Sequence, residues 1–161
     1  MSAVAQKTDA EVWVEAFAEG WRAPDGAAGL VEGFLPWLHE DVRLVQPQIP
    51  DLVGYEEFRT GFADPLFALM PDLRGEVEEW AARGDVIYIQ VRLFGTLAGK
   101  PFEFRSCDRI TLRDGRATER VAFMDPTPIL AAALRRPRAL PAFARMQRRN
   151  LQLLLRKRRG R

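Results

Sequence analysis

The stretch FEFRSCDRITLRDGRATE, residues 102–119, decides the fold of this chain. Apolar and polar residues alternate along its first part, which predicts a half-buried β-strand. Asp114-Gly115 favours a two-residue hairpin turn, after which a second strand begins. The even positions of the first strand share one face and carry a single ionisable group: Phe102, Phe104, Ser106, Asp108, Ile110 and Leu112. Packing alone does not explain an aspartate in such a row.

Three further segments have the same strand character. They are LRGEVEEWAARG (73–84), DVIYIQVRLFGTLAG (85–99) and RATERVAFMD (116–125). Glycine-containing turns at 83–85, 98–100 and 114–115 separate the four segments. The second half of the domain is therefore predicted to be a meander of long antiparallel strands.

The first half has a helical period instead. Apolar residues at helical spacing predict helices over 8–21 and 25–38, and a third, kinked near Asp64-Pro65, over 55–70. Residues 39–46 are predicted to be extended, and the prolines of 46–54 indicate a loop. Helices followed by an antiparallel meander predict an α+β domain.

Composition limits the class of protein. A chain of 161 residues with 47% hydrophobic and 29% charged residues is typical of one soluble domain. The first residues, MSAVAQKTDAEVW, do not have the pattern of a secretory signal, and one cysteine fits a reducing cytoplasm, so we expect a cytoplasmic protein. One histidine and one cysteine also make a zinc site improbable, and no metal site is predicted. High alanine and arginine content suggests a bacterial source.

Charge divides the chain into two predicted parts, a domain over 1–134 and a tail over 135–161. The tail holds eleven of the 24 basic residues and no acidic one, which leaves 13 basic against 22 acidic residues before it. The tail has apolar and arginine residues at helical spacing. It is predicted to be a basic helix or a disordered arm that covers an apolar part of the domain, lies on an anionic membrane surface, or contacts phosphates. Specific recognition of nucleic acid is the least expected of these roles.

The predicted order of helices and strands resembles the nuclear transport factor 2-like superfamily. Within it, the chain is most similar to the SnoaL-like polyketide cyclases, with ketosteroid isomerases as more distant relatives. The passages that carry the resemblance are LHEDVRL (38–44), LVGYEEFRTGF (52–62) and CDRITLRDGRATERVAFMD (107–125). The resemblance covers roughly residues 8–130. It implies a cone-shaped, curved antiparallel sheet wrapped around the helices, with a mostly apolar pocket for a hydrophobic small molecule.

Asp108 occupies the position of the catalytic acid/base aspartate of the SnoaL-like cyclases. If its face lines the cone, burial would raise the pKa of its carboxyl group and suit it to proton transfer. Two structural interpretations stay open: a buried ion pair with Arg92 or Arg105, or an edge position facing solvent.

Gln46 and Tyr88 complete the predicted catalytic set. The isomerases place a general-base aspartate just before a proline at the end of the first strand, where this chain has Gln46-Pro47. Gln46 cannot abstract a proton but can orient a carbonyl or a water molecule. Tyr88 is expected to donate a hydrogen bond to a developing oxyanion, as in the isomerases.

A further group of residues is predicted to contact the ligand or to line the pocket. They are Trp13, Phe17, Trp37, Tyr55, Phe58, Arg92, Phe104, Ser106, Phe123 and Asp125. Asp125 is alternatively expected to cap the segment after the last strand.

The limonene epoxide hydrolases of the same superfamily use an Asp-Arg-Asp arrangement. Here Ala122 stands where their second aspartate is expected, which argues against that mechanism. We therefore expect an enzyme without cofactor that acts by acid/base catalysis on a hydrophobic carbonyl compound of polyketide, steroid or terpenoid type. Cyclisation, isomerisation and dehydration remain open. The alternative is a non-catalytic ligand-binding or dimerisation module, and in either case we expect a homodimer through the sheet.

Overall fold

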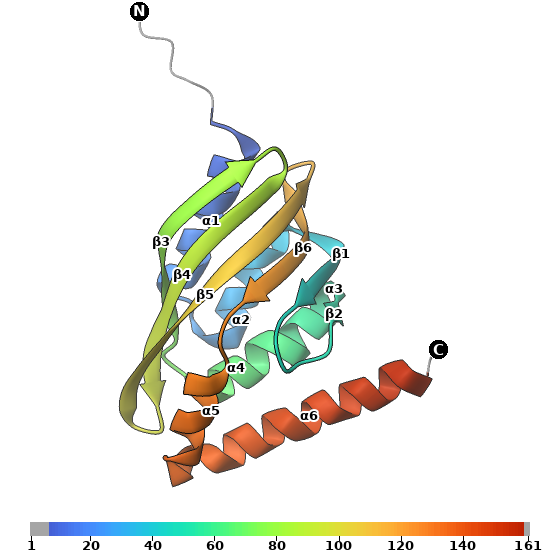
Figure 1. Ribbon diagram of the computed structural model, residues 1–161. Coiled ribbons are helices and arrows are strands. Elements are labelled where there is room, and N and C mark those ends of the chain that lie inside the picture. Colours follow the sequence, from blue (N-terminus) through green and yellow to red (C-terminus); the bar gives the residue numbers. More distant parts are fainter. Residues whose placement is uncertain (1–6, 160–161) are drawn as a thin grey trace, which may run out of the picture.

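A computed structural model describes residues 7–159 and shows one curved, six-stranded sheet with helices on its concave side (Figure 1). The strand order is β2-β1-β6-β5-β4-β3, and β1 and β6 form the parallel pair among otherwise antiparallel neighbours. The strands are β1 (Leu38–Val45), β2 (Leu52–Val53), β3 (Arg74–Arg83), β4 (Val86–Leu97), β5 (Lys100–Arg113) and β6 (Arg116–Phe123). The sheet stays open, and the expected α+β cone is confirmed.

The helices are α1 (Asp9–Arg22), α2 (Gly26–Phe34), α3 (Gly54–Glu57), α4 (Asp64–Leu69), α5 (Thr127–Leu134) and α6 (Leu140–Arg159). Short 3₁₀ turns, η1 (Leu35–Trp37) and η3 (Pro137–Ala139), precede β1 and α6. A π-helical turn, η2 (Phe58–Ala63), joins α3 to α4. Thr8 caps α1 in a capping box with Glu11, as the sequence indicates.

Two helix boundaries differ from those predicted from the sequence, and a proline lies at each. The second helix ends at Phe34 and not at Leu38, because Pro36 removes a backbone donor and a 3₁₀ turn follows. His39 therefore belongs to β1, where its Nε2 lies 3.0 Å from the carbonyl oxygen of Arg113. The kink expected at Asp64-Pro65 is a π-helical turn that ends at Ala63, and α4 begins at Asp64 with Pro65 in its first turn.

Three two-residue turns fix the register of the meander. Leu97 pairs with Lys100, and Arg113 with Arg116, so the residues between them form the turns. Asp114 and Gly115 both have positive φ (51° and 72°), the backbone geometry that such turns require. On the concave face of β4 and β5, Ile89 lies opposite Asp108.

One β-bulge changes which residues of β6 lie on the concave face of the sheet. Leu112 pairs with Ala117, whereas Thr111 pairs with Glu119, which leaves Thr118 as the extra residue. The Thr118 hydroxyl donates to the carbonyl oxygen of Thr111 at 3.2 Å. Because side chains alternate along a strand, the extra residue turns Arg120 and Ala122 onto the concave face.

Aromatic side chains fill the space between the sheet and the helices. Trp13 stacks on Phe17 with ring centroids 5.4 Å apart, and Phe58 stacks on Phe62 at 5.7 Å. Trp21 and Phe34 meet these rings edge to face. The predicted hydrophobic core is therefore built mainly by α1, α2 and η2 against the sheet.

The segment after Asp125 folds back across the wide end of the cone. α5 and α6 lie below the sheet and beside α4 in Figure 1. The predicted basic tail is therefore a helix from Leu140 to Arg159, after the 3₁₀ turn η3. Positions 160–161 at its end, like 1–6 at the start of the predicted domain, lie outside the described range.

Candidate functional site

Two hollows lie inside the cone. The inner one, of about 30 Å³, is enclosed by the aromatic core and by Leu38, Val42 and Ile110. The outer one, of about 110 Å³, lies between the sheet, η2 and the two C-terminal helices. Arg120 and Phe62 border both. The guanidinium carbon of Arg120 is 5.1 Å from the centroid of the Phe62 ring, a cation–π contact at the boundary between the hollows.

Asp108 is fully buried and forms an ion pair with Arg120. Arg120 Nε donates to Asp108 Oδ2 at 2.7 Å, and the Ser106 hydroxyl donates to Oδ1 at 2.6 Å. The Arg120 side chain is itself only 13% exposed. Donors of this kind stabilise the charged carboxylate, and they fix its orientation.

Arg120 also ties this pair to the end of β1. Its Nη1 donates to Gln46 Oε1 at 3.2 Å, whereas Nη2 donates to no residue in the described range 7–159. Gln46, Ser106 and Arg120 line the outer hollow together. Asp108 lies behind Ser106 and Arg120 and lines neither hollow. Ser106 and Arg120 therefore lie between the Asp108 carboxylate and the hollow, and each donates a hydrogen bond to that carboxylate.

Several of the predicted pocket residues do border the hollows. Trp13, Phe17 and Phe58 line the inner one, and Phe104 and Ser106 line the outer one. Gln46 borders the outer hollow from the end of β1.

Trp37 and Tyr55 have structural partners instead. The carbonyl oxygen of Trp37 accepts from the Trp13 indole at 3.0 Å, and the Tyr55 hydroxyl donates to the carbonyl oxygen of Leu38 at 3.0 Å. Neither side chain borders the two hollows.

The expected positions of Tyr88 and Arg92 in the pocket are wrong. Leu97 and Lys100 pair directly, so even positions of β4 lie beside odd positions of β5 on the convex face. Tyr88 is 46% exposed there, opposite Arg109. Arg92 forms ion pairs with Glu76 at 2.7 Å and with Glu103 at 3.3 Å.

Phe123 and Asp125 also lie away from the hollows, so their predicted pocket positions are wrong too. The bulge at Thr118 that turns Arg120 inward turns Phe123 outward, where it is 55% exposed. Asp125 accepts from the Thr127 backbone at 2.9 Å at the start of α5, in agreement with the capping role that the sequence offers. Hydrogen bonds from Thr127 lower the pKa of its carboxyl group.

Arg120 is the residue that sequence reasoning missed. The expected arginine partners of Asp108 were Arg92 and Arg105, but both lie on the convex face, where Arg105 pairs with Glu78 at 2.9 Å. A hairpin without a bulge after Asp114-Gly115 would place Arg120 on the convex face too. The bulge at Thr118 places it on the concave face instead. The polar run Thr118-Glu119-Arg120 is compatible with either face of the sheet, so the sequence pattern alone does not reveal the bulge.

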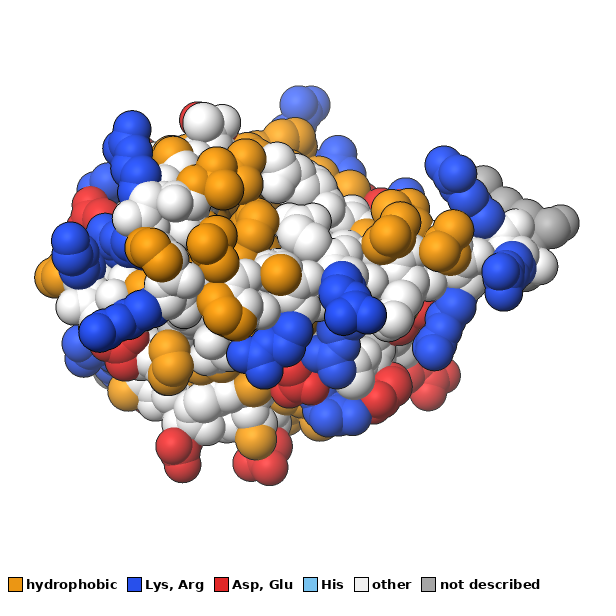
Figure 2. All heavy atoms as spheres, turned by 90° about the horizontal axis from the view of Figure 1, so that it is seen from below, with side chains coloured by type: hydrophobic (Ala, Val, Ile, Leu, Met, Phe, Trp, Pro, Cys, Tyr) orange, Lys and Arg blue, Asp and Glu red, His pale blue; other side chains and the backbone are white. Residues whose placement is uncertain are grey.

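The C-terminal helices close the wide end of the outer hollow. Ile129 and Leu130 of α5, and Phe143, Met146 and Asn150 of α6, form its wall. In Figure 2, which looks onto this end, apolar side chains lie among arginines. The helical tail therefore covers an apolar part of the domain.

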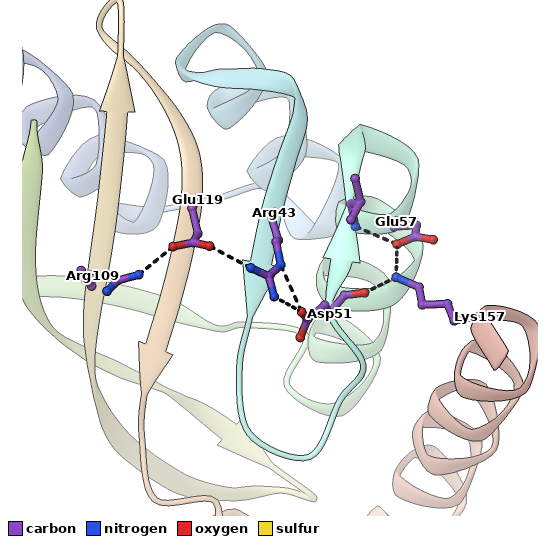
Figure 3. Close-up of polar contacts among 7 residues, drawn as sticks. Arg43, Asp51, Glu57, Arg109, Glu119 and Lys157 are labelled. Atoms are coloured by element: carbon purple, nitrogen blue, oxygen red, sulfur yellow. Dashed lines mark hydrogen bonds and ion pairs between the residues drawn. The ribbon is translucent and has the colours of Figure 1, made fainter. Parts of the chain in front are cut away.

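A lysine near the end of α6 attaches the helix to the body. Lys157 pairs with Glu57 at 2.9 Å and donates to the carbonyl oxygen of Asp51 (Figure 3). Asp51 also accepts from Arg43, which pairs with Glu119 of β6. Figure 3 shows these ion pairs running from the sheet to α6.

Within residues 7–159, no group of three or more His, Cys, Asp or Glu side chains is placed to hold a metal ion. Over the same range, no helix has both the length and the apolar character needed to cross a membrane.

Comparisons with known proteins agree with this architecture. The model of the SnoaL-like domain family matches residues 14–120. No curated protein sequence matches the chain.

Solved structures with the same fold include a protein described as a SnoaL-like polyketide cyclase from Jannaschia sp. CCS1. It has a TM-score of 0.66 and 23% identity over 82% of this chain and 96% of that one. TerC, co-crystallised with polyporic acid, has a TM-score of 0.66 and 20% identity over 78% and 98%. An epoxide hydrolase of limonene-epoxide-hydrolase-like type from M. tuberculosis has a TM-score of 0.61 and 17% identity over 82% and 94%. At these identities the likeness concerns the fold.

Proposed function

The chain belongs to the family of SnoaL-like domains, and from that premise we propose that it is an enzyme that moves a proton on a hydrophobic, carbonyl-bearing small molecule. The observation that carries the proposal is the buried Asp108–Arg120 pair, joined to Ser106 and Gln46 at the wall of an otherwise mostly apolar hollow. Burial of charges is costly, which makes a buried ion pair at the wall of a hollow a candidate binding or reacting group.

Arg120 is proposed to hold the carbonyl oxygen of the ligand. Its Nη2 has no partner among the described residues, and the other two nitrogens are fixed by Asp108 and Gln46. A guanidinium held in this way stabilises the negative charge that develops on the oxygen when the neighbouring carbon loses a proton. The apolar walls exclude water, which strengthens this interaction.

Asp108 is proposed to receive that proton through Ser106. The Ser106 hydroxyl lines the hollow and already donates to Asp108 Oδ1 at 2.6 Å. As the carbon–hydrogen bond breaks, its electron pair forms the enolate, Ser106 Oγ takes the proton, and its own proton passes to Asp108. The reverse transfer to another atom completes an isomerisation, and attack of the enolate on a second carbonyl gives an aldol-type cyclisation.

The register of β6 supports this chemistry over the epoxide hydrolase mechanism of some structural neighbours. Ala122, not an acid, lies directly opposite Asp108. The Asp-Arg-Asp arrangement expected of those hydrolases is therefore incomplete around Asp108.

A second candidate function is ligand binding without catalysis. The observation that favours it is the complete burial of Asp108, whose two oxygens each accept a hydrogen bond from a neighbouring side chain. In that case Arg120 and Gln46 would anchor a carbonyl oxygen and the carboxylate would only position Arg120.

Deuterium exchange separates the two functions. A panel of hydrophobic ketones, including 2-acetylnaphthalene, is incubated with the protein in D₂O, and exchange next to the carbonyl is followed by NMR. The enzyme accelerates exchange, and Asp108→Asn reduces the rate by about 100-fold or more while ketone binding persists. Glu103→Gln, on the same strand but the convex face, serves as the matched control. Binding with no exchange by the wild type establishes the second candidate, and exchange unaffected by Asp108→Asn removes Asp108 from the mechanism.

A further inference from the structure

Asn150 is the fully buried side chain of α6. Among residues 140–159, all within the described range, the others are exposed or half-buried, whereas Asn150 is 4% exposed. A helix that docks through an apolar face normally buries an apolar residue at its centre. The most buried residue of α6, which forms one wall of the outer hollow, is polar instead.

The amide nitrogen of Asn150 is buried and has no hydrogen-bond partner among residues 7–159. The residue borders the outer hollow, together with Met146 and Gln147 from the same helix. A buried donor without a partner destabilises the closed position of the helix. An acceptor inside the hollow removes that penalty.

Arg120 and Asn150 border the same hollow from different elements. Arg120 extends from β6 and Asn150 from α6, across a space otherwise bordered mainly by apolar groups such as Leu69, Leu93 and Phe104. A ligand that fills this hollow meets a cationic donor from the sheet and a neutral amide donor from α6. Two donors on an apolar wall select for two oxygen atoms in the ligand.

We propose that Asn150 is a specificity-determining residue that donates to a second oxygen of the substrate, a carbonyl, ether or hydroxyl oxygen separate from the one held by Arg120. The inference rests on the proposed function and narrows its substrate class to hydrophobic ketones with a second oxygen. Ligand binding then also holds α6 in place, because the bound oxygen gives the Asn150 amide an acceptor that no residue of the described range 7–159 provides.

The hollow itself is consistent with an α6 helix that adjusts to its ligand. Its volume of about 110 Å³ is smaller than the roughly 300–1,000 Å³ of common small-molecule sites. Outside this hollow, α6 packs Ala142 and Leu153 against the core and attaches through Lys157, which pairs with Glu57 and donates to the carbonyl oxygen of Asp51. A ligand larger than the hollow therefore requires α6 to shift against these contacts.

Matched ketones test the second oxygen. Affinities are measured for acetophenone and 4-methoxyacetophenone, and for 2-acetylnaphthalene and its 6-methoxy derivative, which present two different oxygen-to-oxygen spacings. The wild type is expected to bind at least one methoxy ketone roughly three- to tenfold more tightly than its parent. Asn150→Leu abolishes this preference, and Gln152→Leu, which removes an exposed amide from the same helix, preserves it.

Hydrogen exchange of residues 140–159 provides a ligand-free measurement. In the unliganded protein, Asn150→Leu is expected to slow exchange about fivefold, since an apolar side chain replaces an unpaired donor. Faster exchange means that the amide has a partner without the ligand, and it overturns the inference. Ketone binding with no methoxy preference, or with a preference that survives Asn150→Leu, also overturns it and leaves the proposed function intact. Failure of all four ketones to bind overturns the proposed function and this inference with it.

Discussion

Arg120 Nε lies 2.7 Å from Asp108 Oδ2, across two neighbouring strands and at the centre of the concave face of the sheet. The Asp108 side chain is inaccessible to solvent, and the Arg120 side chain is 13% exposed. Its geometry depends on a single inserted residue, Thr118, because without the bulge Arg120 faces outward. The proposed site therefore depends on a backbone irregularity as much as on side-chain identity.

Removal of one partner of this pair is expected to be costly. Arg120→Leu leaves a buried carboxylate without its cation and should lower the free energy of unfolding by about 3–5 kcal/mol. Asp108→Leu combined with Arg120→Leu should cost much less than the two single changes together, since no unpaired charge remains. Urea denaturation at neutral pH measures all three variants, and strictly additive costs would show that the two side chains do not interact.

Cys107 offers a reporter of the charge on Asp108. Its thiol lies on the convex face, one residue from Asp108, and partial burial of the thiol and then the negative charge of Asp108 raise its pKa above the ordinary value. A raised pKa means less reactive thiolate at a given pH. Asp108→Asn removes the second cause, so the midpoint of the pH profile for alkylation by iodoacetamide should move to lower pH.

Glu103→Gln is the matched control for this reporter, because Glu103 lies four positions before Cys107 on the same strand face and is already paired with arginines. An unchanged midpoint in Asp108→Asn would contradict the assignment of part of the raised Cys107 pKa to the charge of Asp108.

The sequence predicts the strands of this fold well because their period and turns are local properties. The segments 73–84, 85–99, 100–115 and 116–125 correspond closely to β3, β4, β5 and β6. Glycine and aspartate in the turns fix where each strand ends, and alternation fixes which residues of each strand share a face.

The candidate site is less predictable, because it depends on how the faces of different strands combine. Two-residue turns place odd positions of one strand beside even positions of the next, and this rule alone moves Tyr88 to the face opposite Asp108. That error was avoidable from the sequence. The bulge at Thr118, which brings in Arg120, has no comparable local signal.

Asp72 predicts an acid-sensitive contribution to stability. Its carboxylate accepts from the Thr96 hydroxyl and backbone, both at 2.7 Å, and these hydrogen bonds, the hydroxyl first, lower the pKa of Asp72 below its ordinary value. When the pKa of a carboxyl group is lower in the folded state than in the unfolded state, the group stabilises the fold. This stabilisation is fully present above the unfolded-state pKa and is lost as the pH falls through the folded-state pKa. Thr96→Val should cost about 0.5 kcal/mol at pH 6, because Asp72 is exposed and water competes.

This cost should shrink below about pH 3.9, the ordinary value for aspartate, since protonation weakens the same hydrogen bonds in the wild type. Thermal unfolding at a series of pH values measures it. A cost of Thr96→Val that is constant down to the acid transition would assign the effect to side-chain packing of Thr96 and not to the carboxylate.

The convex face of the sheet is predicted to pair with a second copy of the chain. Tyr88 and Phe123 are 46% and 55% exposed on this face, and we expect both aromatic side chains to be covered in the dimer. Phe123→Arg should convert a dimer to a monomer, because a charge buried without a partner opposes association. Leu151→Arg, at an equally exposed leucine of α6, should leave the dimer unchanged. Sedimentation velocity distinguishes the species, and a wild type that is monomeric at every concentration measured would contradict the prediction.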